Sequence, residues 1–159
     1  MNVRQMEPSD CAEVFREAED WWGGLYSSDL MAKWYIAHFR DSCFVAEEAN
    51  RLMGFLLGFL SQTFKNEAYI RIVMVNPDHR GQGVGRALYD AFTAYAVRMG
   101  RNTIGCATSP ANQASISFHK SLGFVIQAQQ DELEGLPICK DYDGGGSVRV
   151  VFKKFLTGS

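Results

Sequence analysis

The chain has 159 residues, of which 47% are hydrophobic and 21% are charged, and its formal net charge is -2. This length and balance are typical of one folded domain with a buried core, and they argue against a disordered chain. No block of lysine and arginine suggests a nucleic-acid surface, and no apolar run approaches the roughly 20 residues that a membrane span needs. We therefore predict a single domain over residues 1–159, with no nucleic-acid partner and no membrane partner.

The four cysteines are far apart and form no CxxC pair, which argues against both a zinc site and a disulfide framework. The N-terminal residues lack the apolar core of a secretory signal peptide. We expect a cytoplasmic, reduced protein without a metal. Both a monomer and a homodimer are compatible with the sequence.

Apolar periodicity and capping residues predict the helices and strands. Ser9 or Asp10 can cap the first helix, and Ser28 or Asp29 can cap the second. In chain order the predicted elements are a strand at 3–5, helices at 11–18 and 30–39, strands at 43–46, 52–60 and 68–75, a helix at 83–99, a strand at 103–107, a helix at 109–121, and strands at 124–126 and 148–155. Residues 128–147 are a polar connection of a length that is usually functional or mobile.

The order of these elements predicts a mixed α/β fold. The three strands between residues 43 and 75 are joined by short turns, which is typical of an antiparallel meander. Gly54 and Gly58 in the second of them mark a close backbone approach or a bulge. The helix at 83–99 lies between two strands, so these two strands should be parallel and either neighbours or nearly so.

The junction between the strand at 68–75 and the next helix carries the strongest functional signal. After a proline turn, the segment at 80–86 reads Arg-Gly-Gln-Gly-Val-Gly-Arg. Glycine allows the backbone to approach a ligand closely, and the free N–H groups of a helix's first turn bind anions. The pattern predicts a phosphate-bearing ligand laid along the strand. It is neither a Walker A loop, because no lysine follows the glycines, nor the GxGxxG of a dinucleotide fold.

Two motifs together resemble the GNAT superfamily of acetyl-CoA-dependent N-acetyltransferases. Arg80, Gly83 and Gly85 match the signature [QR]-x-x-G-x-[GA], and a second signature follows at 112–124, from Asn-Gln-Ala to Leu-Gly-Phe. The resemblance covers residues 42–126 in motif and in element order. It covers the first 40 residues by order alone, and 128–147 poorly.

The resemblance implies an acyl-CoA N-acyltransferase fold, with a mostly antiparallel sheet that splays between its fourth and fifth strands and about four flanking helices. It also implies acetyl-CoA as cosubstrate. The pyrophosphate would lie on the backbone N–H groups of the helix N-terminus, and the pantetheine arm would pair with the strand edge like an added strand. The cofactor-binding residues implied are Val73, Met74, Val75, Arg80, Gly81, Gln82, Gly83, Val84, Gly85, Arg86 and Asn112. Arg86 can equally be a solvated helix residue, and Asn112 can equally be a hydrogen-bonding residue at a helix N-terminus.

The same resemblance implies the catalytic groups. A backbone N–H of Val73 or Met74 would stabilise the oxyanion of a tetrahedral intermediate. Many family members have a tyrosine as general acid where this chain has His119, which can donate a proton to the leaving thiolate or be a spectator. Candidates for the base that removes the ammonium proton are Glu47, Glu67 and Tyr69.

The resemblance leaves the acceptor undefined beyond a primary amine of a small molecule or a peptide. Aromatic side chains and the acidic 128–147 connection could bind a cationic amine, or be a core plug and a solvated loop. These residues are Trp21, Trp22, Tyr26, Trp34, Asp131, Glu132, Glu134, Asp141 and Asp143. The expected reaction is direct attack without an acyl-enzyme, and the alternative is a non-catalytic acyl-CoA-binding or sensing module of the same fold.

Overall fold

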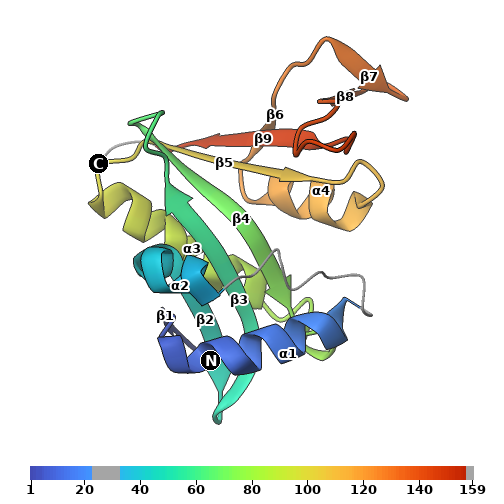
Figure 1. The fold of residues 1–159 in the computed structure, drawn as a ribbon. Coiled ribbons are helices and arrows are strands. Elements are labelled where there is room, and N and C mark those ends of the chain that lie inside the picture. The colour runs from blue at the N-terminus through green and yellow to red at the C-terminus, as the bar shows by residue number, and fades with distance from the viewer. Residues whose placement is uncertain (23–32, 157–159) are drawn as a thin grey trace.

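A computed structural model describes residues 1–22 and 33–156. Its centre is a seven-stranded sheet in the order β1-β2-β3-β4-β5-β9-β6 (Figure 1). The strands of this sheet are β1 Asn2–Gln5, β2 Cys43–Glu48, β3 Arg51–Leu60, β4 Glu67–Val75, β5 Thr103–Thr108, β6 Val125–Ile126 and β9 Val150–Phe155. This order confirms the predicted meander of β2, β3 and β4 and the mixed α/β class.

Helices pack on both faces of the sheet (Figure 1). Their bounds are α1 Cys11–Trp21, α2 Lys33–Phe39, α3 Val84–Arg98 and α4 Gln113–Ser121. Side chains of α3 and α4 share one core with strands from β2 to β9, and side chains of α1 and α2 share a second core with β2, β3 and β4. We call the first side the α3 face and the second the α1 face.

The central splay is present where it was predicted. β4 and β5 pair in parallel only between residues 67–69 and 103–105. Beyond this point β4 continues to Val75 and β5 continues to Thr108 without pairing to each other. The two strands therefore diverge toward their C-terminal ends, and one edge of β4 is left open there.

A β-bulge in β4 accompanies the splay. Leu57 pairs with Ile72 and Gly58 pairs with Ile70, so Arg71 is the extra residue on β4. The bulge reverses the side-chain alternation: Ile70 lies in the core of the α3 face, whereas Ile72 packs on the core of the α1 face. Bulges re-aim side chains in this way and are common beside active sites.

Both glycines of β3 make the predicted close approach. A Cβ at Gly58 would lie 2.4 Å from the Phe92 ring of α3, and a Cβ at Gly54 would lie 2.8 Å from the carbonyl oxygen of Met74. The bulge borders Gly58 as well. Helix α3 can therefore pack close to β3 only because these positions lack side chains.

One predicted helix start is wrong, and one predicted cap is only partly right. Helix α4 begins at Gln113 and not at Ser109, because the Asn112 side chain accepts the N–H of Ser115 and caps it there. Helix α1 begins at Cys11 as predicted, with Asp10 at its N-cap position. The Asp10 side chain makes no cap hydrogen bond to the helix and instead accepts the N–H of Glu7 at 2.7 Å, within a 3-10 turn at 8–10.

Two other expectations need correction, and one lies outside the described residues. The 128–147 connection contains a hairpin of β7 Asp131–Leu133 and β8 Leu136–Ile138. The helical spacing of Leu30, Trp34 and Ala37 or His38 predicts that these residues share the apolar side of the second helix. Helix α2 instead buries Tyr35 and Ile36, and Trp34 is 63% exposed. The predicted start of that helix at residue 30 and its caps fall within 23–32, outside the described residues.

Candidate active site

The glycine loop forms the entrance to α3. A 3-10 turn at 77–79 follows β4, and the backbone then takes left-handed conformations at Gly81 (φ 74°) and Gly83 (φ 85°). Gly83 is the N-terminal cap of α3, and the first helical bond runs from the N–H of Ala87 to its carbonyl. The N–H groups of residues 84–86 therefore have no acceptor within the helix and can bind an anion. A Cβ at Gly81 or Gly83 would meet nothing within 4 Å, so the space in front of this loop is open.

Gly85 has a different role from the two glycines before it. A Cβ at this position would lie 3.0 Å from the Phe118 ring of α4. The glycine thus lets α3 and α4 pack beside each other next to the anion site. The Arg86 side chain is exposed on the first turn of α3.

The open edge of β4 can be assigned to particular backbone groups. The N–H of Asn76 donates to the Met53 carbonyl on β3 at 2.8 Å. In an extended strand successive N–H groups point to opposite edges. Counting back, the N–H of Met74 points to β3, whereas those of Val73 and Val75 point to the open edge. Of the two oxyanion donors left open by the sequence, this geometry favours Val73.

His119 is buried between α4, α3 and the sheet, with 6% of its surface exposed. Its Nδ1 lies 2.7 Å from the carbonyl oxygen of Ser115, and its Nε2 lies 2.7 Å from the Tyr89 hydroxyl. A carbonyl accepts only, so Nδ1 carries the proton and Nε2 accepts from Tyr89. The ring also stacks on Phe152 at 4.9 Å. Burial lowers the pKa of His119, which favours the neutral ring.

In this arrangement the Nδ1 proton points to the Ser115 carbonyl, and Nε2 carries no proton. Neither ring nitrogen of His119 therefore offers a proton to a ligand at the open edge of β4. The general-acid role of His119 stays a prediction. Tyr89, its hydrogen-bond partner, could not be identified from the sequence, because the pair joins residues 30 positions apart on two helices.

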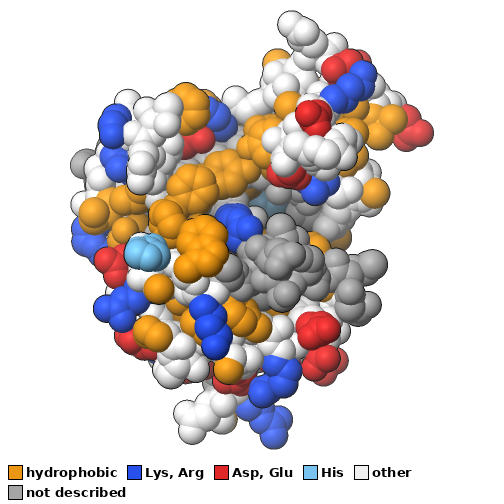
Figure 2. Space-filling model, viewed as in Figure 1, with side chains coloured by type: hydrophobic (Ala, Val, Ile, Leu, Met, Phe, Trp, Pro, Cys, Tyr) orange, Lys and Arg blue, Asp and Glu red, His pale blue; other side chains and the backbone are white. Residues whose placement is uncertain are grey.

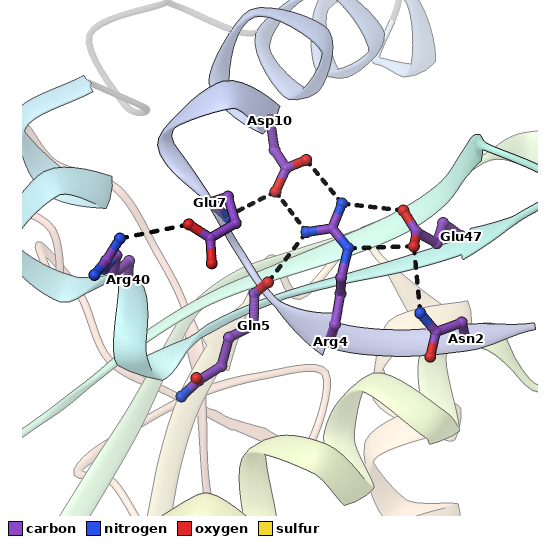
Figure 3. Close-up of polar contacts among 7 residues, drawn as sticks. All are labelled: Asn2, Arg4, Gln5, Glu7, Asp10, Arg40 and Glu47. Carbon is purple, nitrogen blue, oxygen red and sulfur yellow. Dashed lines mark hydrogen bonds and ion pairs between the residues drawn. The ribbon is translucent and has the colours of Figure 1, made fainter.

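Glu47 belongs to an ion-pair network at the edge of the sheet (Figure 3). The Arg4 guanidinium binds Glu47 at 3.0 Å and Asp10 at 2.8 Å. Hydrogen bonds from Arg4 lower the pKa of the Glu47 carboxyl, and they lower that of Asp10 as well. A carboxylate held in this way is a weaker base, and we assign Glu47 a structural role in joining β1, β2 and the turn before α1.

The other two base candidates lie at the start of β4, where the splay begins. The Glu67 carboxylate forms an ion pair with Lys153 of β9, with 2.9 Å between the nitrogen and the oxygen. The hydroxyl of Tyr69 lies 2.8 Å from that of Tyr142. Burial raises the pKa of both tyrosines, so both phenols are protonated at neutral pH.

Tyr142 is a second site residue that the sequence analysis missed. It lies on a tight loop in which Asp141, Gly144, Gly145 and Gly146 all have positive φ. The Asp141 carboxylate accepts the N–H of Gly146 at 2.6 Å and closes the loop. The glycine run was visible in the sequence, but the partner of Tyr142 is 73 residues away and was not.

The aromatic residues expected near the acceptor have different environments. Trp21 stacks on Phe55 with ring centroids 6.1 Å apart, which supports the core-plug interpretation for this residue. Trp22 is 46% exposed at the end of α1. Tyr26 lies outside the described residues.

Most of the acidic side chains of the 128–147 connection already have partners. Asp131 pairs with Lys140 at 2.7 Å, and Asp143 pairs with Arg149 at 2.8 Å. Over residues 1–22 and 33–156 no three His, Cys, Asp or Glu side chains are grouped as metal ligands would be. In the same ranges, no helix has the length and apolar character to cross a membrane.

Comparison with known proteins gives consistent matches. The model of the Acetyltransferase (GNAT) family matches residues 10–124. An uncharacterised N-acetyltransferase of Methanocaldococcus jannaschii is 34% identical over 96 residues, which are 58% of this chain and 42% of that protein. The L-methionine sulfoximine/L-methionine sulfone acetyltransferase of Salmonella typhimurium is 28% identical over 84% of this chain and 85% of its own length. Among solved structures, Ard1 from Thermoplasma volcanium superposes with a TM-score of 0.80 at 24% identity, over 98% of this chain and 97% of that chain.

The family match spans most of the chain, including both motifs, and the fold shows the splayed sheet and the glycine loop at a helix N-terminus. The chain therefore belongs to the GNAT family of acetyl-CoA-dependent N-acetyltransferases.

Proposed function

We propose that this enzyme transfers the acetyl group of acetyl-CoA to a primary amine of a small molecule or a peptide by direct attack through a tetrahedral intermediate. The observation that carries the proposal is the open edge of β4, which leads into the anion-binding N-terminus of α3. One element thus offers a backbone edge for an extended amide-bearing arm, and the next offers N–H groups for a pyrophosphate.

The proposed cofactor contacts involve three segments of the chain. The pyrophosphate would lie on the N–H groups of the loop and first helical turn at 80–86, and Arg86, exposed on that turn, would add charge. The pantetheine amides would pair with the backbone at 73–75, where Val73 and Val75 turn their N–H groups to the open edge. The Asn112 side chain would contact the other half of the arm in addition to capping α4.

The reaction needs an oxyanion donor beside the thioester. We assign this role to the N–H of Val73, because that of Met74 points to β3. As the amine nitrogen forms its bond to the acetyl carbon, the thioester oxygen gains negative charge and the Val73 N–H stabilises it. The carbon–sulfur bond then breaks, and the CoA thiolate leaves.

The amine must lose a proton, and we assign its removal to Tyr69, because Glu47 and Glu67 are held in ion pairs with Arg4 and Lys153. The phenol of Tyr69 is protonated, so it can accept a proton only by passing its own to Tyr142 in the same step. The two hydroxyls, 2.8 Å apart, would therefore act as a relay from the amine toward solvent. The proton for the thiolate comes from His119 or from solvent.

The comparison with the Salmonella protein supports a small-molecule acceptor. Its name states that it acetylates methionine derivatives, which carry an α-amine, and the match covers 84% of this chain. We therefore place amino acids first among the amines to be tested.

Two measurements test the proposal. Titration calorimetry should show binding of acetyl-CoA and none of NAD or ATP, and an absence of acetyl-CoA binding would refute the cofactor assignment. Thiol release should then be followed with amino acids, peptides, polyamines and simple alkylamines. A protein that binds acetyl-CoA and releases no thiol with any amine would support the non-catalytic alternative.

A further inference from the structure

Arg71 faces the side of the sheet from which an acceptor would approach. It is the extra residue of the β4 bulge, and its guanidinium carbon lies 5.1 Å from the ring centroid of Tyr35 on α2. Tyr35 belongs to the core of the α1 face. The bulge thus places a half-buried cation on the α1 face, beside the splay.

Tyr35 is a rigid support for this cation. Its hydroxyl donates to the Gly58 carbonyl at 3.0 Å, and Gly58 is one of the residues that define the bulge. Its ring stacks on Phe39 with centroids 4.7 Å apart. A guanidinium lying over an aromatic face keeps its N–H groups at the edge of its plane, where a carboxylate can accept two of them. The ring that supports Arg71 is therefore fixed by the same bulge that places the Arg71 side chain on the α1 face.

Arg71 is also at a suitable distance from the reacting centre. Two strand positions, or roughly 7 Å, separate its Cα from that of Val73, the assigned oxyanion donor. The flexible arginine side chain can cover this separation. In an α-amino acid a single carbon joins the amine to the carboxylate. An acceptor whose amine faces the thioester at Val73 would therefore have its carboxylate within reach of the Arg71 side chain.

Three carboxylates at the start of β4 and in the 128–147 connection already form ion pairs. Glu67, Asp131 and Asp143 are engaged with Lys153, Lys140 and Arg149 respectively. These carboxylates would have to leave their partners to bind a polyamine. Figure 2 shows hydrophobic side chains across the middle of this face, with both positively and negatively charged side chains around them.

From this placement we infer that the acceptor is a free α-amino acid and that Arg71 binds its carboxylate. The inference rests on the proposed acetyl transfer. The α-amine loses its proton and bonds to the acetyl carbon, the carbon–sulfur bond breaks, and the thiolate takes up a proton. The carboxylate does not react, so Arg71 is a specificity-determining residue and acts chiefly on binding.

Matched acceptor pairs test the inference. L-Methionine is compared with 3-(methylthio)propylamine, and L-phenylalanine with 2-phenylethylamine, since each pair differs by the carboxylate alone. Thiol release is measured for the natural protein, Arg71→Gln and Arg71→Lys. Arg51→Gln, at an exposed position at the start of β3, is the surface control. Acetyl-CoA affinity and the melting temperature verify that each variant is folded.

We expect Arg71→Gln to lower kcat/KM for the amino acids by about tenfold to a hundredfold, mainly through KM. The decarboxylated partners should be affected less than about threefold. Arg71→Lys should fall between, because lysine keeps the charge and loses the bidentate geometry. Arg51→Gln should match the natural protein.

Three outcomes would overturn the inference. In the first, the natural protein prefers the decarboxylated amines or a peptide that begins with alanine. In the second, Arg71→Gln lowers kcat/KM equally for both members of a pair. In the third, Arg71→Gln weakens the binding of acetyl-CoA. In each of these cases amine acetylation itself would stand. If the protein bound acetyl-CoA but acetylated neither member of any pair nor any other amine, the proposed function would fail as well.

Discussion

The two faces of the sheet are covered to different extents. On the α3 face, α3 and α4 pack against strands from β2 across to β9. On the α1 face, the described helices α1 and α2 pack only against β2, β3 and β4. The groups assigned to acetyl-CoA are backbone N–H groups at the border of the first core, positioned by glycines and a helix terminus. The groups assigned to the acceptor are side chains on the second face, namely Tyr69, Arg71 and Tyr142. The cofactor site is thus built from local backbone geometry, and the acceptor site from contacts between distant segments.

The largest effect is expected at the cofactor loop, from Gly83→Glu. This change places a carboxylate where the pyrophosphate would lie and forces a side chain into a left-handed conformation. Losing two or more charge-assisted hydrogen bonds, at about 1.5–3 kcal/mol each, should weaken acetyl-CoA binding by more than about a hundredfold. Titration calorimetry measures the loss.

Gly100→Glu is the matched control for this variant. Gly100 has a φ of 73° at the opposite end of α3, so the backbone strain is similar and the anion site is untouched. Similar affinity losses in the two variants would show that strain, and not the position of the charge, weakens binding.

A proline scan of β4 separates the two oxyanion candidates. Val73→Pro removes an N–H at the open edge, so the ladder to β3 should persist while turnover falls by about 100- to 1000-fold. Met74→Pro removes an N–H that points to β3 and should mainly lower the melting temperature. Thermal melts and single-turnover rates of both variants measure the contrast. The reverse pattern, with Val73→Pro active and unstable, would reassign the donor to Met74.

A smaller effect is expected from the close packing on the α3 face. In Gly58→Ala the new methyl group would lie 2.4 Å from the Phe92 ring, and such overpacking costs about 1–3 kcal/mol of unfolding free energy. Phe92→Leu should relieve part of this clash. Chemical denaturation of the two single variants and the double variant gives the coupling energy. Additive losses would mean that the ring moves aside without cost.

The same contrast explains which parts of the structure could be predicted. The glycine loop, the βαβ unit and the splay follow from signals confined to a few neighbouring residues or from the resemblance that those residues carry. The start of α4 was wrong because two capping signals compete within four residues. Ser109 and Pro110 form the first signal, and Asn112 forms the second. The N–H of Asn112 donates to the Ser109 carbonyl in a backbone turn, so the helix begins only after Asn112.

Features of the acceptor face were missed for a different reason. The hairpin of β7 and β8 has strands too short to show alternation, and its turn at Glu134 and Gly135 is held by two positive φ angles. Arg71 became a candidate only through the register of the bulge, and Tyr142 only through its contact with Tyr69. Neither pairing leaves a periodic signal in one sequence.

The smallest expected effect concerns His119, which lies between α3, α4 and the sheet. Its folded-state pKa is lowered by burial from its ordinary value of about 6.5. Below that value the unfolded chain binds the additional proton more readily than the folded one. Stability from the neutral ring is therefore fully present above about pH 6.5 and declines as the pH falls toward the lower folded pKa. His119→Gln should flatten this part of the stability profile, measured by denaturation between pH 5 and 7.5.

The same variant tests the general-acid prediction. A general acid contributes about 100- to 10,000-fold to the rate, whereas the buried, hydrogen-bonded His119 leads us to expect a loss of kcat below about tenfold in His119→Gln. Acetyl-CoA affinity should not change. We would measure kcat of the natural protein and of His119→Gln between pH 6 and 9. A large loss of kcat, together with loss of the pH dependence seen in the natural protein, would assign the thiolate's proton to His119. A small, pH-independent loss would instead assign that proton to solvent and leave His119 as the hydrogen-bonded partner of Tyr89 in the core of the α3 face.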